Sequence, residues 1–328
     1  MRVCIVGAGA IGGLLGTRLA LAGEQVSVLA RGDSLAAIRS DGLVLVEPDG
    51  SVHAARDIAV AADLAAFGPQ DVVVLAVKAH QLADVAPELE QLYDDATVVV
   101  PLQNGLPWWF FQKFPGPYEG RRVAALDPDG IVERHVPPDR IVAAIAYPAA
   151  ERDKPGVIRL VEGDRFPVGE LDGSRTERVA AIAEALTAAG FTSRVVTDVR
   201  SHLWVKAWGN LAFNPISALT GATLAQIARW PATRGLAAQM MGEAAAVAEH
   251  LGLRLRISIE QRIDGAEQVG EHKTSMLQDV EAGRPLEVEP IIGAFVELGR
   301  LTGTPMPVTE SVYSLVSLLD ARLRSAVP

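Results

Sequence analysis

The sequence predicts an α/β protein in which an N-terminal, Rossmann-type doubly wound sheet is followed by an all-helical C-terminal domain. Three observations predict this class. A glycine-rich turn joins a short apolar strand to a helix at the start of the chain. Apolar runs typical of buried parallel strands then alternate with helical segments up to residue 198. From residue 199 the apolar residues follow a helical period. We therefore place residues 1–198 in a sheet domain and residues 199–328 in a helical domain.

The composition of the 328 residues indicates a globular protein without membrane spans. The apolar runs are shorter than the ~20 residues needed to cross a bilayer, and the chain enters a strand at once, which leaves no room for a signal peptide. A net charge of −10 argues against nucleic acid and anionic membranes as partners. The single cysteine, Cys4, cannot form an internal disulfide. We expect a cytoplasmic protein whose anionic ligands are held by local features.

The glycine-rich turn has the G-x-G-x-x-G spacing of a dinucleotide-binding site. Gly7 is expected to make the tight turn, Gly9 to let the backbone approach a pyrophosphate, and Gly12 to let the helix pack close to the strand. Ala10 and Ile11 lie within this turn and are expected at the cofactor too, and the N-terminus of the helix that follows presents free N–H groups and a positive dipole to the phosphates. The expected flanking elements are strands over Val3–Val6 and Gln25–Ala30 and a helix over Leu14–Ala22.

The residue after the second strand indicates which dinucleotide binds. An NAD site usually carries an acidic residue there for the ribose hydroxyls, whereas this chain has Arg31. A guanidinium fits a 2′-phosphate, so we predict NADP(H). The alternative is an arginine that only caps the strand edge, and the charge of nearby Asp33 would weaken the preference for NADP(H).

Further polar residues follow two apolar strands, at the edge where ligands of open α/β sheets bind. Lys78 and Gln81 follow the run Val72–Val77, and Asn104 follows Ala96–Leu102. We predict that Lys78 and Gln81 reach the cofactor. We expect Asn104 near the nicotinamide, where it would serve both cofactor and substrate. The alternative is that each of these residues caps the end of its strand.

The remaining elements of the first domain are less regular. Aromatic residues cluster at Leu106–Phe111, which we interpret as core packing, with a lid over the substrate as the alternative. Residues 115–140 are expected to be irregular. The other expected segments are helices over Ser34–Ser40, Leu82–Leu92 and Ser174–Gly190, strands over Leu43–Glu47 and Val52–Ala55, strands over Arg140–Ala150, Gly156–Glu162 and Asp164–Gly169 that extend the sheet, and a last strand over Phe191–Val196.

The first helix of the second domain carries an unusual polar stripe. Lys206, Asn210 and Asn214 recur every fourth residue in a stretch that is otherwise apolar on nearly every face. A buried lysine needs a charged partner or a wet cavity. The alternative is that Lys206 reaches solvent and that the asparagines cap the helix before Pro215. Later helices are expected over Leu224–Trp230, Pro231–Leu251, Ile257–Asp264, Glu271–Ala282, Glu287–Thr302 and Thr309–Leu323.

Taken together, these motifs resemble the ketopantoate reductase (2-dehydropantoate 2-reductase) family over nearly the whole chain. The matching residues are Gly7–Gly13, Arg31, Val77–Gln81, Asn104–Gly105, Lys206–Pro215 with Ala218–Thr220, Ser275–Asp279 and Glu287. The resemblance implies a Rossmann domain, a helical domain with a cleft between them, and reduction of a 2-keto acid by NADPH.

The resemblance also implies roles for the residues at matching positions. Lys206 corresponds to the catalytic lysine, with Asn210 and Asn214 near lysine and substrate. Ser275 corresponds to the serine that binds the substrate carboxylate, and Glu287 to the acidic residue paired with the lysine. On a helix Glu289 would point about 200° away from Glu287, so only one of the two can face the site.

This set of residues fits keto-acid chemistry. As hydride arrives, the carbonyl becomes an alkoxide that needs a proton donor and an electrostatic stabiliser. We expect Lys206 to be the general acid, and no metal is needed because the histidines have no ligand spacing. Where some family members place an asparagine for the distal hydroxyl, this chain has Gly221–Leu224, so a different, more apolar 2-keto acid is an alternative substrate.

The sequence also allows two other functions and a homodimer. An opine-type dehydrogenase would use one of His202, His250 or His272. A non-enzymatic NADP(H)-sensing protein would keep the fold without the chemistry. The apolar, Ala-rich helices of the second domain are compatible with a homodimer.

Overall fold

The computed structural model describes residues 1–326, which divide into two compact units. The first unit contains Met1–Gln103, Phe111–Arg121 and Gly130–Val199, and the second contains Asn104–Phe110, Arg122–Asp129 and the residues from Arg200 onward. The predicted single boundary at residue 198 therefore differs from the observed division, because two short early segments belong to the second unit.

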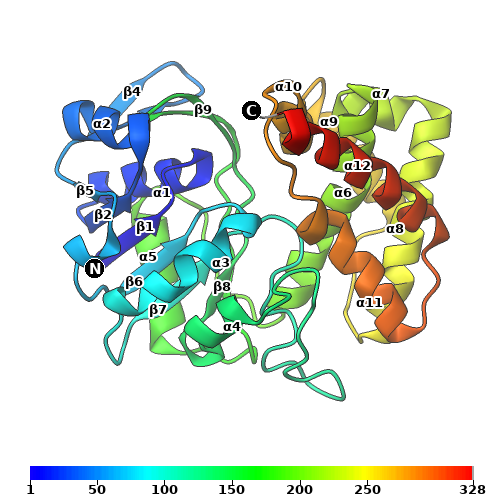
Figure 1. Cartoon of the computed structure of the whole chain (residues 1–328), viewed down its shortest axis with the longest axis horizontal. Coiled ribbons are helices and arrows are strands. Elements are labelled where there is room, and N and C mark those ends of the chain that lie inside the picture. Colours follow the sequence, from blue (N-terminus) through cyan, green and yellow to red (C-terminus); the bar gives the residue numbers. More distant parts are fainter. Residues whose placement is uncertain (327–328) are drawn as a thin grey trace. The chain divides into compact units, whose positions relative to one another are not determined.

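The first unit is built on a five-stranded parallel sheet with strand order β5-β2-β1-β6-β7 (Figure 1). Its strands are β1 (Arg2–Val6), β2 (Gln25–Leu29), β5 (Ala59–Ala61), β6 (Val72–Leu75) and β7 (Val98–Pro101). The sequence of β6 explains its place inside the sheet, between β1 and β7, since its valines and leucine are buried on both faces. This order places β1 and β6 side by side, so their carboxyl ends and the segments that follow them lie at one edge.

Helix α1 (Ala10–Leu21) is covered by protein on more than one side. Gly12 faces the first sheet, where a Cβ would lie 3.1 Å from Ile5 Cγ2. Gly13 faces away from that sheet, where an added Cβ would lie 2.6 Å from Ile158, and an added Cβ at Gly16 would meet both Leu43 at 3.0 Å and Ile5 at 3.4 Å. The small residues of α1 therefore let it pack between the first sheet and a second one.

The second sheet has the order β4-β3-β10-β9. It contains β3 (Leu43–Val46), β4 (Val52–Ala55), β9 (Ala149–Lys154) and β10 (Val157–Glu162), and β10 runs parallel to β3 and antiparallel to β9. The expectation that the strand over Gly156–Glu162 extends the first sheet is wrong. Its alternating buried residues, Ile158 and Leu160, belong to a sheet that covers α1 instead.

A third pair of strands, β8 (Val142–Ala144) and β11 (Val168–Glu170), is antiparallel. A single bridge from Val99 to Ile141 links it to β7. The predicted last strand over 191–196 does not form a ladder: isolated bridges join Thr192 to Arg165 and Val195 to Val168 of β11.

The helices of the first unit are mostly short. They are α1, α2 (Gly32–Asp41), α3 (Leu82–Val85), α4 (Ile131–His135) and α5 (Glu177–Ala188), with 3-10 turns at Leu64–Ala66, Ala79–Gln81, Ala86–Leu92 and Pro138–Arg140. The predicted helix over Leu82–Leu92 is thus α-helical only in its first turn. Pro87 lies in the part that is a 3-10 helix, where it lacks the N–H of a regular turn.

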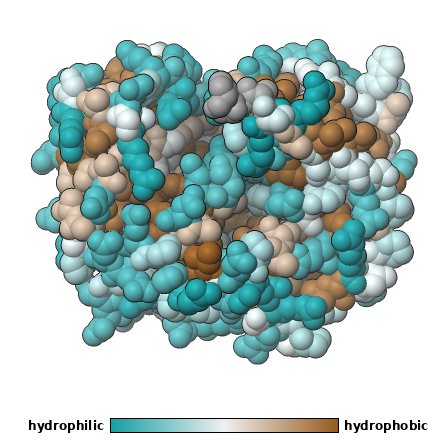
Figure 2. Space-filling model, in the orientation of Figure 1, coloured by the Kyte–Doolittle hydropathy of each residue, from teal (hydrophilic) through white to brown (hydrophobic). Residues whose placement is uncertain are grey.

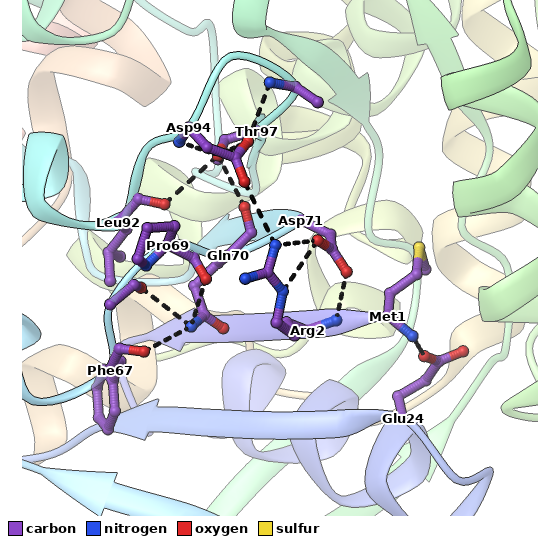
Figure 3. A network of polar contacts seen from close by, with 12 residues as sticks. Met1, Arg2, Glu24, Phe67, Pro69, Gln70, Asp71, Leu92, Asp94 and Thr97 are labelled. Atoms are coloured by element: carbon purple, nitrogen blue, oxygen red, sulfur yellow. Dashed lines mark hydrogen bonds and ion pairs between the residues drawn. The ribbon is translucent and has the colours of Figure 1, made fainter.

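A polar network fixes the beginning of the sheet (Figure 3). The Arg2 guanidinium donates to Asp71 Oδ1 at 2.6 Å and to Asp94 Oδ2 at 3.3 Å, and Asp94 accepts from Thr97 Oγ1 at 3.0 Å. The guanidinium lowers the pKa of Asp71, chiefly through this hydrogen bond. The network joins the starts of β1, β6 and β7, which leaves their opposite ends for the glycine turn and the residues around Lys78.

The second unit is helical. Its elements are α6 (Val199–Thr220), α7 (Leu224–Arg229), α8 (Pro231–His250), α9 (Ile259–Val269), α10 (Ser275–Glu281), a π-helical turn (Glu289–Gly293), α11 (Ala294–Thr302) and α12 (Pro307–Ala326). The expected helix at Glu287 begins later and with a π turn. Helix α9 ends at Val269 rather than at Asp264, because Gly270 with a φ of 88° stops it there.

The surface carries both apolar and hydrophilic side chains. Figure 2 shows apolar side chains as separate patches among hydrophilic ones. The exposed apolar side chains include Trp230 before α8 and Leu315 and Leu318 on α12. Among residues 1–326 no helix has the length and apolar content that a bilayer span requires.

Candidate functional site

The glycine turn of the first unit has the geometry expected for a tight strand-to-helix connection. Gly7 has a φ of 113°, and a Cβ there would lie 2.9 Å from the Val77 nitrogen. A Cβ at Gly12 would lie 2.1 Å from the Gly7 oxygen. Only glycine fits at these two positions.

The mouth of this turn is open where a phosphate would approach. Gly9 precedes α1 in an extended conformation, and the nearest heavy atom to an added Cβ is 4.0 Å away. No side chain caps the helix, and Ala10 and Ile11 are partly exposed. Uncapped N–H groups beside free space suit a pyrophosphate, so the chain's own residues fit a dinucleotide here.

Arg31 lies directly beyond β2, at the start of α2, and is exposed. Among residues 1–326 no hydrogen bond or ion pair engages its side chain. Asp33 lies in the first turn of α2, close by in the sequence. The structure thus leaves the guanidinium available to a ligand at the edge of the sheet.

Lys78 and Gln81 follow β6 as predicted, but they are not equivalent. The Lys78 nitrogen donates to Gln81 Oε1 at 3.2 Å, so the Gln81 side chain closes its own 3-10 turn. Lys78 is partly buried beside the glycine turn's neighbour Val77. For Gln81 this contact agrees with the alternative prediction, in which its side chain caps the end of the strand.

The polar stripe of the second unit lies on one long helix. Helix α6 continues through Pro215 to Thr220, so the asparagines do not cap it before the proline. Lys206 is partly exposed and Asn214 is 5% exposed. Neither the Asn210 nor the Asn214 side chain hydrogen-bonds to another of the described residues. The stripe therefore presents amide groups with hydrogen-bonding capacity to spare.

The Lys206 ammonium has two partners in the second unit. Its Nζ donates to Asn104 Oδ1 at 3.0 Å. Burial lowers the pKa of Lys206 to about 8, and the negative charge of Glu287 acts against that decrease. A lysine with this pKa is mostly charged at pH 7 and loses its proton far more readily than an ordinary lysine.

The contact between Asn104 and Lys206 was not predicted from the sequence. It arises because Gly105, with a φ of 80°, approaches the chain after Glu287 so closely that a Cβ would lie 2.0 Å from the Pro290 oxygen. The Leu106 nitrogen donates to the same oxygen at 2.8 Å. The glycine after Asn104 was the available signal, since a positive φ often marks such an approach.

Glu287 and Glu289 have different surroundings, as expected from their spacing. Glu287 is 9% exposed, whereas Glu289 is exposed and accepts a hydrogen bond from the Tyr313 hydroxyl at 2.8 Å. The charge that acts on Lys206 is that of Glu287. Ser275 is exposed and is the first residue of α10, after Thr274, which caps that helix through Leu277.

The aromatic run after Gly105 is packed in the interior. Trp108, Trp109, Phe110 and Phe111 are each at most 4% exposed. Phe110 packs on Trp204 of α6 at 5.7 Å between ring centroids. This run therefore supports the helix that carries Lys206, as the core-packing interpretation predicted. No group of three metal-ligating side chains occurs in the part of the chain that the structure describes.

The parallel sheet with its glycine turn, joined to helices that carry a half-buried lysine, defines a Rossmann-type oxidoreductase. Two family models match the chain: "Ketopantoate reductase PanE/ApbA" over residues 3–115 and "Ketopantoate reductase PanE/ApbA C terminal" over residues 198–320. The chain belongs to the ketopantoate reductase family.

Individual relatives agree with this assignment. A 2-dehydropantoate 2-reductase of Mesorhizobium japonicum is 50% identical over 97% of this chain and 98% of its own length. A provisionally assigned ketopantoate reductase from Ralstonia solanacearum has a TM-score of 0.93 at 39% identity, covering 98% of each chain. A D-mandelate dehydrogenase solved with NADH and anilino(oxo)acetate has a TM-score of 0.82 at 22% identity, covering 99% of this chain and 100% of that chain, a likeness of fold alone.

Proposed function

We propose that the protein reduces a 2-keto acid to a 2-hydroxy acid with NADPH, with 2-dehydropantoate as the substrate. The proposal rests on the surroundings of Lys206. Its ammonium donates a hydrogen bond to Asn104, and the negative charge of Glu287 raises its pKa. Membership of the ketopantoate reductase family and the 50% identical relative from Mesorhizobium japonicum support the same substrate class.

Lys206 acts as the general acid in this reaction. The substrate carbonyl gains negative charge as it is reduced, and an ammonium beside it both stabilises that charge and supplies the proton. Glu287 favours the charged form of the lysine, and Asn104 fixes the direction of one N–H. After the proton has moved, the lysine is neutral and regains a proton from solvent.

The amide and hydroxyl groups around the lysine orient the substrate. Asn210 and Asn214 offer donors one and two helical turns after Lys206. Ser275 offers an exposed hydroxyl at the start of α10 for the carboxylate. A bound nicotinamide would supply the hydride, which is chemistry that belongs to the cofactor.

The cofactor is NADP(H), held by the first unit. Gly7, Gly9 and Gly12, with the N–H groups of Ala10 and Ile11, receive the pyrophosphate, and Arg31 receives the 2′-phosphate. Lys78, Gln81 and Asn104 are the remaining residues assigned to the cofactor.

The alternative substrate is a more apolar 2-keto acid. The segment Gly221–Leu224 offers no asparagine for a distal hydroxyl, and Thr223 is used to cap α7 through Gln226. This observation favours testing substrates that lack the distal hydroxyl beside 2-dehydropantoate.

The decisive experiment is NADPH oxidation with a panel of 2-keto acids. We expect turnover with 2-dehydropantoate or a close analogue, and a loss of about 10²–10⁴-fold in kcat for Lys206→Ala. If Lys206→Ala kept kcat within about tenfold of the parent, the general-acid role would be wrong. NADPH binding without turnover would favour a sensor, and turnover that requires an added amine would favour an opine-type dehydrogenase.

A further inference from the structure

The side chain of Gln103 continues the hydrogen bonding of the first sheet beyond its last paired residues. The ladder between β6 and β7 ends at Leu75 and Pro101. Two residues after β7, Gln103 Nε2 donates to the Leu75 oxygen at 3.0 Å and to the Val77 oxygen at 3.0 Å. The amide therefore ties the end of β7 to the segment that follows β6.

The two acceptors determine the orientation of this amide. If the amide were flipped, its oxygen would face two carbonyl oxygens, which cannot donate a hydrogen bond. In the observed orientation Gln103 Oε1 is buried, and within residues 1–326 it has no hydrogen-bond partner. A buried acceptor without a donor is uncommon and costs stability. The hydrogen bonds donated by Nε2 are thus the polar contacts that hold the Gln103 amide in place.

The segment that this amide holds lies against the glycine turn. A Cβ at Gly7 would lie 2.9 Å from the Val77 nitrogen and 3.0 Å from the Ala76 carbonyl carbon. Opposite Gly9, the nearest heavy atom to an added Cβ is the Ala76 oxygen, at 4.0 Å. The position of residues 76–77 therefore sets how much space remains beside Gly9.

A second glutamine makes the same kind of contact at the opposite end of β6. Gln70 Nε2 donates to the oxygens of Phe67, Gly68 and Pro69 at 3.1, 3.1 and 3.3 Å (Figure 3). Its Oε1 atom is likewise buried and has no partner in the part of the chain that the structure describes. The two glutamines differ in the end of β6 at which they lie, and only Gln103 holds the segment beside the glycine turn.

We propose that Gln103 is a positioning residue for the dinucleotide. Its amide holds residues 76–77 against the glycine turn, so that the space beside Gly9 is already shaped before the cofactor binds. The assignment rests on the proposed function, which places the pyrophosphate at the glycine turn, and deepens it. A binding segment that is ordered in the free protein loses less conformational freedom when the ligand binds, and the affinity is higher for that reason.

The test is the affinity of Gln103→Met for NADPH, measured by fluorescence titration. Methionine keeps the approximate size of the side chain and removes both donated hydrogen bonds. We expect the Kd for NADPH to rise about three- to tenfold, the range that one neutral hydrogen bond contributes. The KM for NADPH should rise in parallel, while the KM for 2-dehydropantoate at saturating NADPH stays within about twofold. An unchanged Kd for NADPH would overturn the assignment.

Gln70→Met is the matched control for a general loss of stability. Both variants lose buried hydrogen bonds, so both should lower the Tm of the ligand-free protein. Only Gln103→Met should raise the Kd for NADPH. Equal increases of the Kd in the two variants would overturn the assignment, because the effect would then follow from destabilisation alone.

Hydrogen exchange of the ligand-free proteins reports on the segment itself. Peptides that cover residues 76–82 should exchange faster in Gln103→Met than in the parent, and saturating NADPH should restore their protection. Unchanged exchange in this segment would contradict the proposal. If Gln103→Met does not fold, Gln103→Asn serves for the same measurements, because its amide is one methylene too short to reach both carbonyls.

The nucleotide titration separates this assignment from the proposed reaction. If the parent binds NADPH but reduces no 2-keto acid, the proposed function fails, and the Kd of Gln103→Met still decides the role of Gln103. If the parent binds only NADH, the same comparison is made with NADH. If it binds neither nucleotide, the proposed function and this assignment are both overturned.

Discussion

The Lys206 ammonium is held by two opposing effects. Burial favours the neutral amine and lowers its pKa to about 8, whereas the carboxylate of Glu287 favours the charged form. Asn104 adds a hydrogen bond to the charged form. An ordinary surface lysine would hold its proton too tightly to transfer it near neutral pH, since its pKa is about 10.4. These surroundings support the proposed role of Lys206 as the general acid.

The pH dependence of the reaction follows from this pKa. A general acid must be protonated before the step, so kcat/KM for reduction should be constant below about pH 8 and fall about tenfold per pH unit above it. Oxidation of the 2-hydroxy acid needs the neutral amine and should rise through the same pH. Glu287→Gln removes the charge that raises the pKa of Lys206, so the fall in the rate of reduction and the rise in the rate of oxidation should both occur at lower pH. If both pH profiles were unchanged in Glu287→Gln, the role of that carboxylate would be contradicted.

We propose that Arg31 sets the preference for NADP(H) over NAD(H). Its side chain is exposed beyond β2, and a guanidinium binds a phosphate better than a ribose hydroxyl. Arg31→Ala should raise the Kd for NADPH by at least about tenfold, because charged hydrogen bonds are lost, and leave the Kd for NADH within about twofold. Fluorescence titration with both nucleotides measures this. Equal weakening of both would show that Arg31 does not contact the 2′-phosphate.

At the scale of elements, two glycines of the turn are expected to have different roles, Gly12 in folding and Gly9 in ligand binding. Gly9 has a φ of −79° and free space around its added Cβ, whereas a Cβ at Gly12 would overlap the Gly7 oxygen. Gly9→Ala should keep the Tm within about 2 °C but weaken NADPH binding at least about tenfold, because the methyl group occupies the approach of the pyrophosphate. Gly12→Ala should lower the Tm by several degrees, since overpacking costs about 1–3 kcal/mol. Thermal unfolding and nucleotide titration distinguish the two variants. A Gly9→Ala protein that binds NADPH normally would contradict the position of the phosphates.

Elements with a strong local pattern could be predicted, and those that depend on distant partners could not. The turn around Gly7 and the apolar helix around Lys206 carry their signals within a few residues. The strand over Val157–Glu162 also has a clear pattern, but its pairing with β3 is set by the packing of α1. The contact between Asn104 and Lys206 spans 102 residues and depends on the close approach at Gly105. No local pattern specifies such a contact.

At the scale of the whole molecule, the second unit is completed by early segments of the chain. Asn104–Phe110 and Arg122–Asp129 belong to it. The Phe110 oxygen accepts from Arg200 Nε at 2.7 Å, and Glu297 accepts from the nitrogens of Ala124 and Ala125 at 2.8 Å each. The aromatic group of Phe110, Trp204 and Phe295 likewise draws on both parts of the sequence.

A fragment of residues 199–328 should therefore fail to form a native core. Without Phe110 the Trp204 ring loses an aromatic neighbour, and the buried Arg200 loses the oxygen that accepts its Nε proton. Large-to-small losses in a core cost about 3–5 kcal/mol for an aromatic side chain, which is a large part of a typical unfolding free energy of 5–15 kcal/mol. We expect helical far-UV circular dichroism but no near-UV tryptophan signal and no cooperative thermal transition, in contrast to the full chain. A fragment that melts cooperatively near the Tm of the full protein would show that the early segments add little to the second unit. That result would also leave Asn104 as a residue that the helical unit does not need to hold Lys206 in place.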